Sequence, residues 1–178
     1  SSAVVEDGSQ SAWAGQFSTF LDVPSENIHE CVIACFASVH SARARAYGEE
    51  RSIRAHLVPM AVLVQPMIPA DVAGVGFTVD PVSKDRTRVL IESVQGNGMS
   101  LVDGTVTPDT YILKKEDGQV LARHGGALHA PLLDSAQLQI VFENVCALEA
   151  YCGGPQDVEW ALVDTVCWIL QSRPITTL

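Results

Sequence analysis

The sequence from Met60 onward is a succession of short apolar runs, each bounded by proline, glycine or polar turn residues. The runs read MAVLVQPMI (60–68), AGVGFTVDPV (73–82), TRVLIESV (87–94), DTYILKKEDGQVLARH (109–124) and QDVEWALVDTVCWILQSRPI (156–175). Asp117-Gly118 predicts a two-residue hairpin turn inside the fourth run, and a short polar turn divides the last run. Strands joined by tight turns favour antiparallel pairing, so the sequence predicts a mainly antiparallel α+β fold rather than a parallel doubly wound sheet.

Two amphipathic helices complete the expected fold. Ser25 is the expected N-cap of the first helix, and Gly48 is expected to end it. Asp134 or Ser135 is expected to cap the second helix, which Gly153-Gly154 would end. The apolar stripes, with spacings of three and four, are Ile28, Val32, Cys35, Phe36, Val39 and Ala46 in the first helix, and Leu138, Val141, Phe142, Val145, Leu148 and Cys152 in the second.

The net charge and hydropathy of the chain argue against some classes of binding partner. The formal net charge is −10, whereas nonspecific nucleic-acid binding requires a basic surface. The longest apolar runs are too short to cross a bilayer, and no signal-peptide pattern is recognised. Five cysteines, an odd number in a domain of ordinary size, favour reduced thiols. We therefore expect a cytoplasmic protein with neither a nucleic-acid nor a membrane partner, in which a polyanionic ligand would need a metal ion or a few placed arginines.

The final hairpin sets three polar side chains among apolar neighbours. Glu159 lies on its first strand, and Gln171 and Arg173 lie on its second. Side chains alternate across a strand, so the turn decides whether the three meet. A three-residue loop, 163–165, would put them on one surface, whereas a two-residue loop would separate them. Together they would suit Mg²⁺ and phosphate oxygens. The alternative is an edge hairpin with a cross-strand Glu–Arg pair and no further function.

Four segments of the sequence carry a more specific pattern. PQDVEWALVDTVCWILQSRPITTL (155–178) contains Gln-Asp-(Ile/Val)-Glu-Trp followed by Gln-Ser-Arg-Pro-Ile. SSAVVEDGSQSAWAGQFSTFLDV (1–23), VLVQPMIPADVAGVGFTVDPVS (62–83) and GNGMSLVDGTVTPDTY (96–111) precede it. Taken in chain order, the four segments resemble the ATP-binding region of the phosphoenolpyruvate synthase and pyruvate phosphate dikinase family, whose superfamily includes rifampicin phosphotransferase.

The resemblance implies an ATP-grasp fold, in which ATP is gripped between two subdomains. Residues 1–178 are then interpreted as a single domain, the C-terminal part of the ATP-grasp unit of a longer enzyme. Its partners would be ATP, an N-terminal ATP-grasp subdomain that bears a phosphate-binding Lys, and a phosphohistidine domain of the same enzyme. On this interpretation those two domains, and the domain that binds the acceptor, lie outside this chain.

The resemblance also implies roles for individual residues. Glu159 and Gln171 would hold Mg²⁺ against the β- and γ-phosphates, and Arg173 would neutralise phosphate charge as the terminal phosphates leave. The remaining nucleotide contacts would come from a small-residue loop that covers the triphosphate and from a strand beside adenine, namely Gly15, Thr19, Phe20 and Gln65. The family sequence Gly-Leu-Gly-Glu is here Gly-Asn-Gly-Met, so the acid is replaced by Met99. Glu92 could substitute for it.

The expected activity is that of a dikinase-type phosphotransferase with ATP and Mg²⁺ as cofactors. The parent enzyme would cleave ATP to AMP and pass the β-phosphoryl group through a histidine to pyruvate or a related acceptor. A rifampicin-type antibiotic phosphotransferase is an alternative within the family. A degenerate, non-catalytic nucleotide-binding module and a plain α+β interaction domain are alternatives of other classes. The isolated chain is expected to bind nucleotide weakly and to catalyse nothing.

Overall fold

The computed structural model describes residues 2–3, 17–50, 59–98, 101, 104–125 and 130–175 of the chain. The chain divides into two compact units, Ser1–Met67 and Ile68–Leu178. The expectation that residues 1–178 form a single domain of an ATP-grasp unit stays a prediction.

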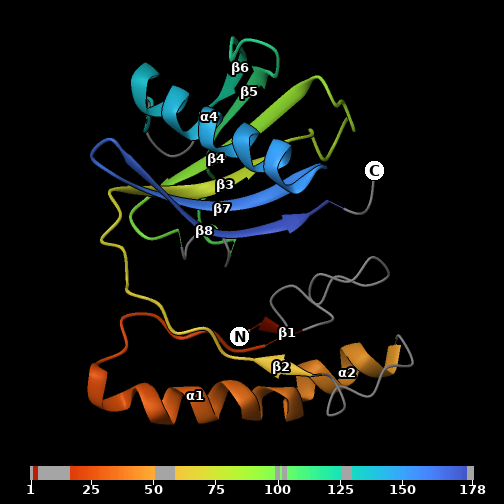
Figure 1. The fold of residues 1–178 in the computed structure, drawn as a ribbon, viewed down its shortest axis with the longest axis vertical. Helices are drawn as coiled ribbons and strands as arrows, with labels where there is room; N and C mark the ends of the chain where they lie inside the picture. Colours follow the sequence, from red (N-terminus) through yellow and green to blue (C-terminus); the bar gives the residue numbers. More distant parts are fainter. Residues whose placement is uncertain are drawn as a thin grey trace. The chain divides into compact units, whose positions relative to one another are not determined.

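The second unit is built on a six-stranded sheet in the order β6-β5-β4-β3-β7-β8. Every neighbouring pair in it is antiparallel. The strands are β3 (Val72–Phe77), β4 (Arg88–Gln95), β5 (Asp109–Lys114), β6 (Val120–His124), β7 (Gln156–Val163) and β8 (Val166–Pro174). Figure 1 shows helix α4 (Ser135–Cys152) lying across one face of this sheet. The expected mainly antiparallel α+β fold is confirmed.

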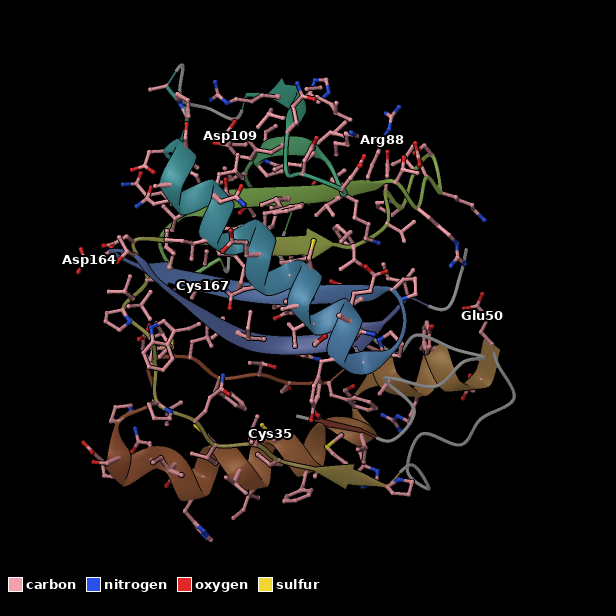
Figure 2. All side chains as sticks on the ribbon, turned by 45° about the horizontal axis from the view of Figure 1, so that its top comes forward. Cys35, Glu50, Arg88, Asp109, Asp164 and Cys167 are labelled. Carbon is pink, nitrogen blue, oxygen red and sulfur yellow. The ribbon has the colours of Figure 1, made fainter. Side chains whose placement is uncertain are left out.

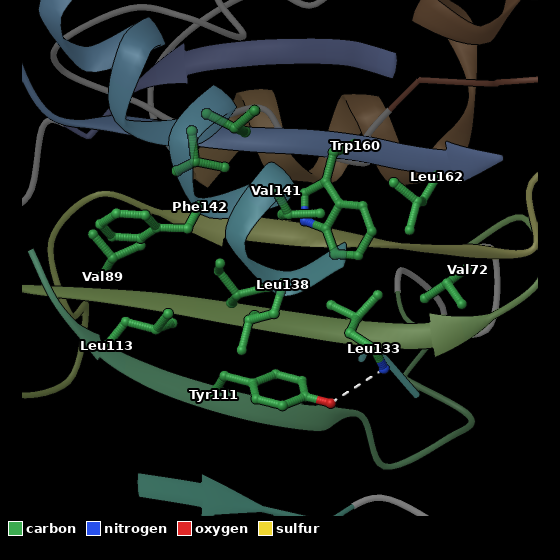
Figure 3. Close-up of a cluster of buried hydrophobic side chains, with 13 residues drawn as sticks. Val72, Val89, Tyr111, Leu113, Leu133, Leu138, Val141, Phe142, Trp160 and Leu162 are labelled. Carbon is green, nitrogen blue, oxygen red and sulfur yellow. Dashed lines mark hydrogen bonds between the residues drawn. The ribbon is translucent and has the colours of Figure 1, made fainter. Parts of the chain in front are cut away.

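The core of the second unit lies between α4 and the sheet, as Figure 3 shows. Trp160 of β7 is fully buried there, as are Val141 and Val145 of α4. Gly76 of β3 allows the helix to approach the sheet, because a Cβ at this position would lie 2.6 Å from a Val145 methyl group. A glycine in a strand interior therefore has a packing reason here.

Helix α4 begins and ends as the sequence predicts. Asp134 is the N-cap, and its side chain forms a reciprocal capping box with Gln137. Gly153 ends the helix in the left-handed conformation, with φ of 74°. The signals that define α4 are local, which is why the sequence reveals them.

A buried polar network fastens the segment before α4 to the sheet. Asp109 of β5 accepts hydrogen bonds from the hydroxyl of Tyr111 (2.6 Å), from Nε of Arg123 (2.8 Å) and from the backbone N–H of Leu132 (3.0 Å). The Tyr111 hydroxyl in turn accepts from the N–H of Leu133, the bond drawn in Figure 3. The Pro-Asp-x-Tyr sequence thus joins β5, β6 and the entry to α4.

The first unit differs from expectation in its helices. A single helix with a stop at Gly48 was expected, but α1 (Ile28–Ala37) and α2 (Ala42–Glu50) are separate. The 3₁₀ helices η1 (Ser25–Asn27) and η2 (Ser38–His40) precede and follow α1. Ser41 is extended, with ψ of 153°, and its hydroxyl accepts from the N–H of Ala44. A serine that caps the following turn therefore breaks the predicted helix. Gly48 lies buried inside α2.

Two strand predictions are only partly correct. In the run 60–68 only β2 (Met60–Ala61) is a strand, and it pairs with β1 (Ser2–Ala3). The predicted hairpin around Asp117-Gly118 is present, with β5 paired to β6, but its connection covers residues 115–119 rather than two residues. In the described part of the chain, none of the helices has the length and apolar character that a membrane span requires.

Candidate functional site

The sheet face opposite α4 carries the polar side chains of the final hairpin. Glu159 of β7 pairs with Gln171 of β8, and Asp157 pairs with Arg173. Residues paired across two strands project from the same face, so all four side chains lie on one surface. Nη2 of Arg173 donates to Oε1 of Glu159 at 3.0 Å, and both side chains are partly buried. The expected convergence of Glu159, Gln171 and Arg173 is present.

The turn that was expected to produce this convergence is wrong. The loop has two residues, because Val163 pairs with Val166 and not Leu162 with Val166. Asp164 lies at the tip of the hairpin (Figure 2) and adopts φ of 52° there. A two-residue loop in a regular ladder would turn Gln171 toward the core face.

An extra residue on β8 restores the arrangement. Trp160 pairs with Ile169 but Glu159 pairs with Gln171, so Leu170 has no opposite residue and forms a β-bulge. The bulge shifts the alternation of β8 by one residue and brings Gln171 and Arg173 onto the face of Glu159. It avoids burying a guanidinium against α4, which would be costly.

Asp157 joins the predicted residues at this face. It lies two residues before Glu159 on β7 and therefore shares its face, and it pairs with Arg173. It is half-buried, and its Oδ1 has no hydrogen-bond partner among the described residues. Burial raises the pKa of its carboxyl group, Arg173 opposes that rise, and Glu159 adds to it. A partly desolvated carboxylate oxygen without a partner is suited to a cation or a donor from outside the chain.

Glu92 lies on the same face, two strands away. It pairs with Val75 of β3, which in turn pairs with Glu159, so the Cα atoms of the two glutamates are separated by about 10 Å. Burial raises the pKa of Glu92. Met99 lies outside the described residues, and the idea that Glu92 substitutes for the family acid stays a prediction.

An apolar hollow occupies the turn end of the same hairpin. Its volume is about 320 Å³, and it is lined by Ile68, Pro69, Val163, Asp164, Val166 and Trp168. Val163 and Trp168 share the face of Glu159, because Val163 is four residues along β7 and Trp168 pairs with Ala161. The face therefore has a charged part and an apolar part along one pair of strands.

The donor set of the charged part suits Mg²⁺. Glu159, Gln171 and Asp157 offer only oxygen ligands of the kind that Mg²⁺ prefers. No group of three or more His, Cys, Asp or Glu side chains is arranged to hold a metal ion within the described ranges. Such a group is not required, because Mg²⁺ commonly uses one or two carboxylates together with phosphate oxygens and water.

The other predicted nucleotide contacts belong to the first unit. Thr19, Phe20 and Gln65 are exposed there, outside helices and strands. Gly15 lies outside the described residues. The nucleotide-binding roles of these four residues stay predictions, whereas the structure brings together the three hairpin residues.

Comparison with known proteins shows the family of the chain. Residues 1–178 match the model of the family described as "Pyruvate phosphate dikinase, AMP/ATP-binding domain". The chain is 38% identical to a probable phosphoenolpyruvate synthase of Methanothermobacter thermautotrophicus, covering 100% of this chain and 29% of that protein. It is 37% identical to a rifampicin phosphotransferase of Streptomyces sviceus, covering 100% of this chain and 23% of that protein. It is 34% identical to the prodigiosin synthesizing transferase PigC of Serratia marcescens, covering 99% and 22%. The chain thus spans less than a third of the length of these relatives.

Proposed function

Because the chain belongs to the pyruvate phosphate dikinase AMP/ATP-binding domain family, we propose that it forms part of the ATP site of a dikinase-type phosphotransferase. The observation that carries this proposal is the meeting of Glu159, Gln171 and Arg173 on the sheet face opposite α4. The fold is the α+β sheet expected for the C-terminal subdomain of an ATP-grasp unit. The opposing subdomain and the phosphohistidine domain would belong to the remainder of the full-length protein.

The three residues would act on the phosphate end of ATP. Glu159 and Gln171 would hold Mg²⁺, which when bound neutralises charge on the β- and γ-phosphates. Asp157 would accept a hydrogen bond from a metal-bound water or supply a further oxygen. Arg173 would exchange its contact with Glu159 for phosphate oxygens, which its planar fork of donors fits. The guanidinium would then stabilise charge that develops as the terminal phosphates leave.

The apolar hollow would receive the base end of the nucleotide. Trp168 offers an aromatic surface, and Ile68, Val163 and Val166 surround it. Stacking on an aromatic side chain stabilises a bound nucleobase of any kind, because every base has a π-face. Trp168 pairs with Ala161, which lies two residues, about 7 Å, along β7 from Glu159. Base and phosphates could therefore lie along one hairpin.

The acceptor is the part of the activity on which the relatives diverge. Identities of 38% and 37% to a probable phosphoenolpyruvate synthase and to a rifampicin phosphotransferase favour neither. We propose that ATP is cleaved to AMP and that the β-phosphoryl group passes through a histidine of another domain to pyruvate or a related acceptor. The γ-phosphoryl group would be transferred to water and leave as orthophosphate, or to inorganic phosphate and leave as pyrophosphate. A rifampicin-type antibiotic is the second candidate acceptor, and the replacement of the family acid by Met99 supports a non-catalytic nucleotide-binding module as a third possibility.

The test uses the full-length protein and ATP labelled at the β-phosphate. AMP should form and the label should appear on a histidine, and both should require Mg²⁺. Addition of pyruvate or of rifampicin should then discharge the label in one case only. Binding of ATP without AMP formation would support the non-catalytic module. Steady ATP hydrolysis by the isolated chain that is lost in Glu159→Gln would contradict the proposal. It would mean that the ATP site does not need the opposing subdomain of the full-length protein.

A further inference from the structure

The strand that bears Gln171 and Arg173 lies at the edge of the sheet. Among the described residues, β8 is the last strand and pairs with β7 alone. The bulge at Leu170 interrupts that ladder immediately before Gln171. An edge strand past a bulge has fewer constraints on its backbone than a central strand.

A buried hydrogen-bonded strap holds this segment from the opposite face. Gln156, at the start of β7, has an exposed fraction of only 4%. Its Oε1 accepts from the hydroxyl of Ser172 at 2.8 Å. Its Nε2 donates to the carbonyl oxygens of Gly154 and Pro155, both at 3.1 Å. The amide side chain is therefore fixed at both ends, as a rigid anchor for Ser172.

The same residue is fastened to β3 through its backbone. The N–H of Gln156 donates to Oγ1 of Thr78 at 2.8 Å, and its carbonyl accepts from the N–H of Thr78 at 3.0 Å. Thr78 is fully buried. The backbone of Gln156 is thus bonded to the residue that follows β3, whereas its side chain alone reaches β8, beneath the point where Asp157 and Arg173 pair on the site face.

We propose that Gln156 and Ser172 are positioning residues for Gln171, the proposed Mg²⁺ ligand, and for Arg173, the proposed phosphate contact. Ser172 stands between these two residues in the sequence and projects to the other face. A hydrogen bond that fixes Ser172 therefore fixes the backbone from which both functional side chains project. This inference rests on the proposed function, in which Arg173 contacts phosphate. Misplacement of a contacting group by about 1 Å can lower a rate about a hundredfold.

The test compares two single-bond deletions in the full-length protein. Ser172→Ala removes the bond that holds β8, and Thr78→Val removes the acceptor of the Gln156 N–H on the β3 side. Ser172→Ala should lower kcat for AMP formation about tenfold or more, with a smaller change in the KM for ATP. Thr78→Val should lower thermal stability yet keep kcat within about twofold of the wild type. Ser172→Thr, which keeps a hydroxyl, should recover most of the rate.

A double variant separates the strap from general damage. In Gln156→Met the acceptor is lost, so adding Ser172→Ala should lower kcat no further. Equal kcat losses in Ser172→Ala and Thr78→Val, or an unchanged kcat in Ser172→Ala, would overturn the positioning role. Hydrogen–deuterium exchange provides a readout independent of turnover: the peptide containing 171–173 should exchange faster in Ser172→Ala and not in Thr78→Val. If the wild type forms no AMP, the proposed function fails, and the exchange result alone decides whether the strap holds Arg173.

Discussion

Arg173 and Glu159 form an ion pair diagonally across the final hairpin, with Nη2 and Oε1 separated by 3.0 Å. The paired residues are Glu159 with Gln171 and Asp157 with Arg173, so the arginine reaches past its own partner. The guanidinium of Arg173 therefore lies against the proposed metal ligand. If Glu159 holds Mg²⁺ and Arg173 contacts phosphate, as proposed, the contact between the two side chains would have to open.

Glu159→Gln should remove Mg²⁺-dependent ATP binding from the full-length protein while leaving it folded. The partly exposed ion pair contributes no more than about 1 kcal/mol to stability, so the effect should appear in binding. Titration calorimetry with ATP, with and without Mg²⁺, measures it. Glu143→Gln on α4 is the matched control, because Glu143 lies on the helix that covers the opposite face. Equal ATP affinity in both variants would refute the assigned role of Glu159.

Trp168→Ala should weaken binding of ATP about tenfold because a stacked base loses its aromatic partner. Inorganic tripolyphosphate, which lacks a base, should bind the variant as it binds the wild type. Tyr151→Ala is the control, since Tyr151 is an aromatic residue of α4 with an exposed fraction of 88%. Competition between each ligand and a fluorescent nucleotide gives both affinities. A parallel loss for ATP and tripolyphosphate would place Trp168 at the phosphates or show damage to the hairpin.

Asp109→Asn should destabilise the chain by about 3 kcal/mol, because it leaves Arg123 without its anion in a largely buried network. Burial alone would raise the pKa of Asp109, but hydrogen bonds from Tyr111, Arg123 and the Leu132 N–H outweigh it and lower the pKa. A lowered pKa stabilises the fold above the ordinary value of about 4, and this stability is lost as pH falls below it. Urea denaturation between about pH 2 and pH 7 should show a smaller acid-induced loss in the variant than in the wild type. Parallel pH profiles would contradict this assignment.

Three cysteines of the second unit should react at different rates. Burial raises the pKa of Cys146 and of Cys167 to about 11, so few of these thiols are ionised near neutral pH. Cys152, at the end of α4, is exposed. Labelling the full-length protein with iodoacetamide at about pH 8 and mapping peptides by mass spectrometry should show Cys152 modified at least about tenfold faster. Comparable rates at all three would show that α4 does not protect the core as described.

The elements predictable from the sequence are those whose signals are local. Asp134, Gln137 and Gly153 mark both ends of α4, and the alternation of β7 assigns Glu159 to one face. The break at Ser41 is harder to foresee, because serine tolerates a helix interior and caps one equally well. The apolar run after Met60 has strand propensity, yet Pro66 within it and Pro69 directly after it cannot donate ladder hydrogen bonds.

The meeting of Glu159, Gln171 and Arg173 on one face was predicted correctly, but the turn expected to cause it was wrong. The three-residue turn does not form, and the bulge at Leu170 supplies the missing shift. No local pattern marks that bulge, because the burial of Trp160 on one side and the charges on the other decide where it falls. Strand alternation alone puts Asp157 on the face of Glu159, but only its unpartnered oxygen and its desolvation indicate a role.

Because of Leu170, the set of polar side chains that meet on the site face does not depend on one exact number of residues in the hairpin. Leu170 has no paired residue on β7, so its removal would leave Glu159 paired with Gln171 and Asp157 paired with Arg173. A protein one residue shorter at this point could present the same carboxylate, carboxamide and guanidinium to a ligand. Searches that demand a fixed interval between the glutamate and the glutamine would pass over such a protein, whereas a comparison of which side chains meet would find it.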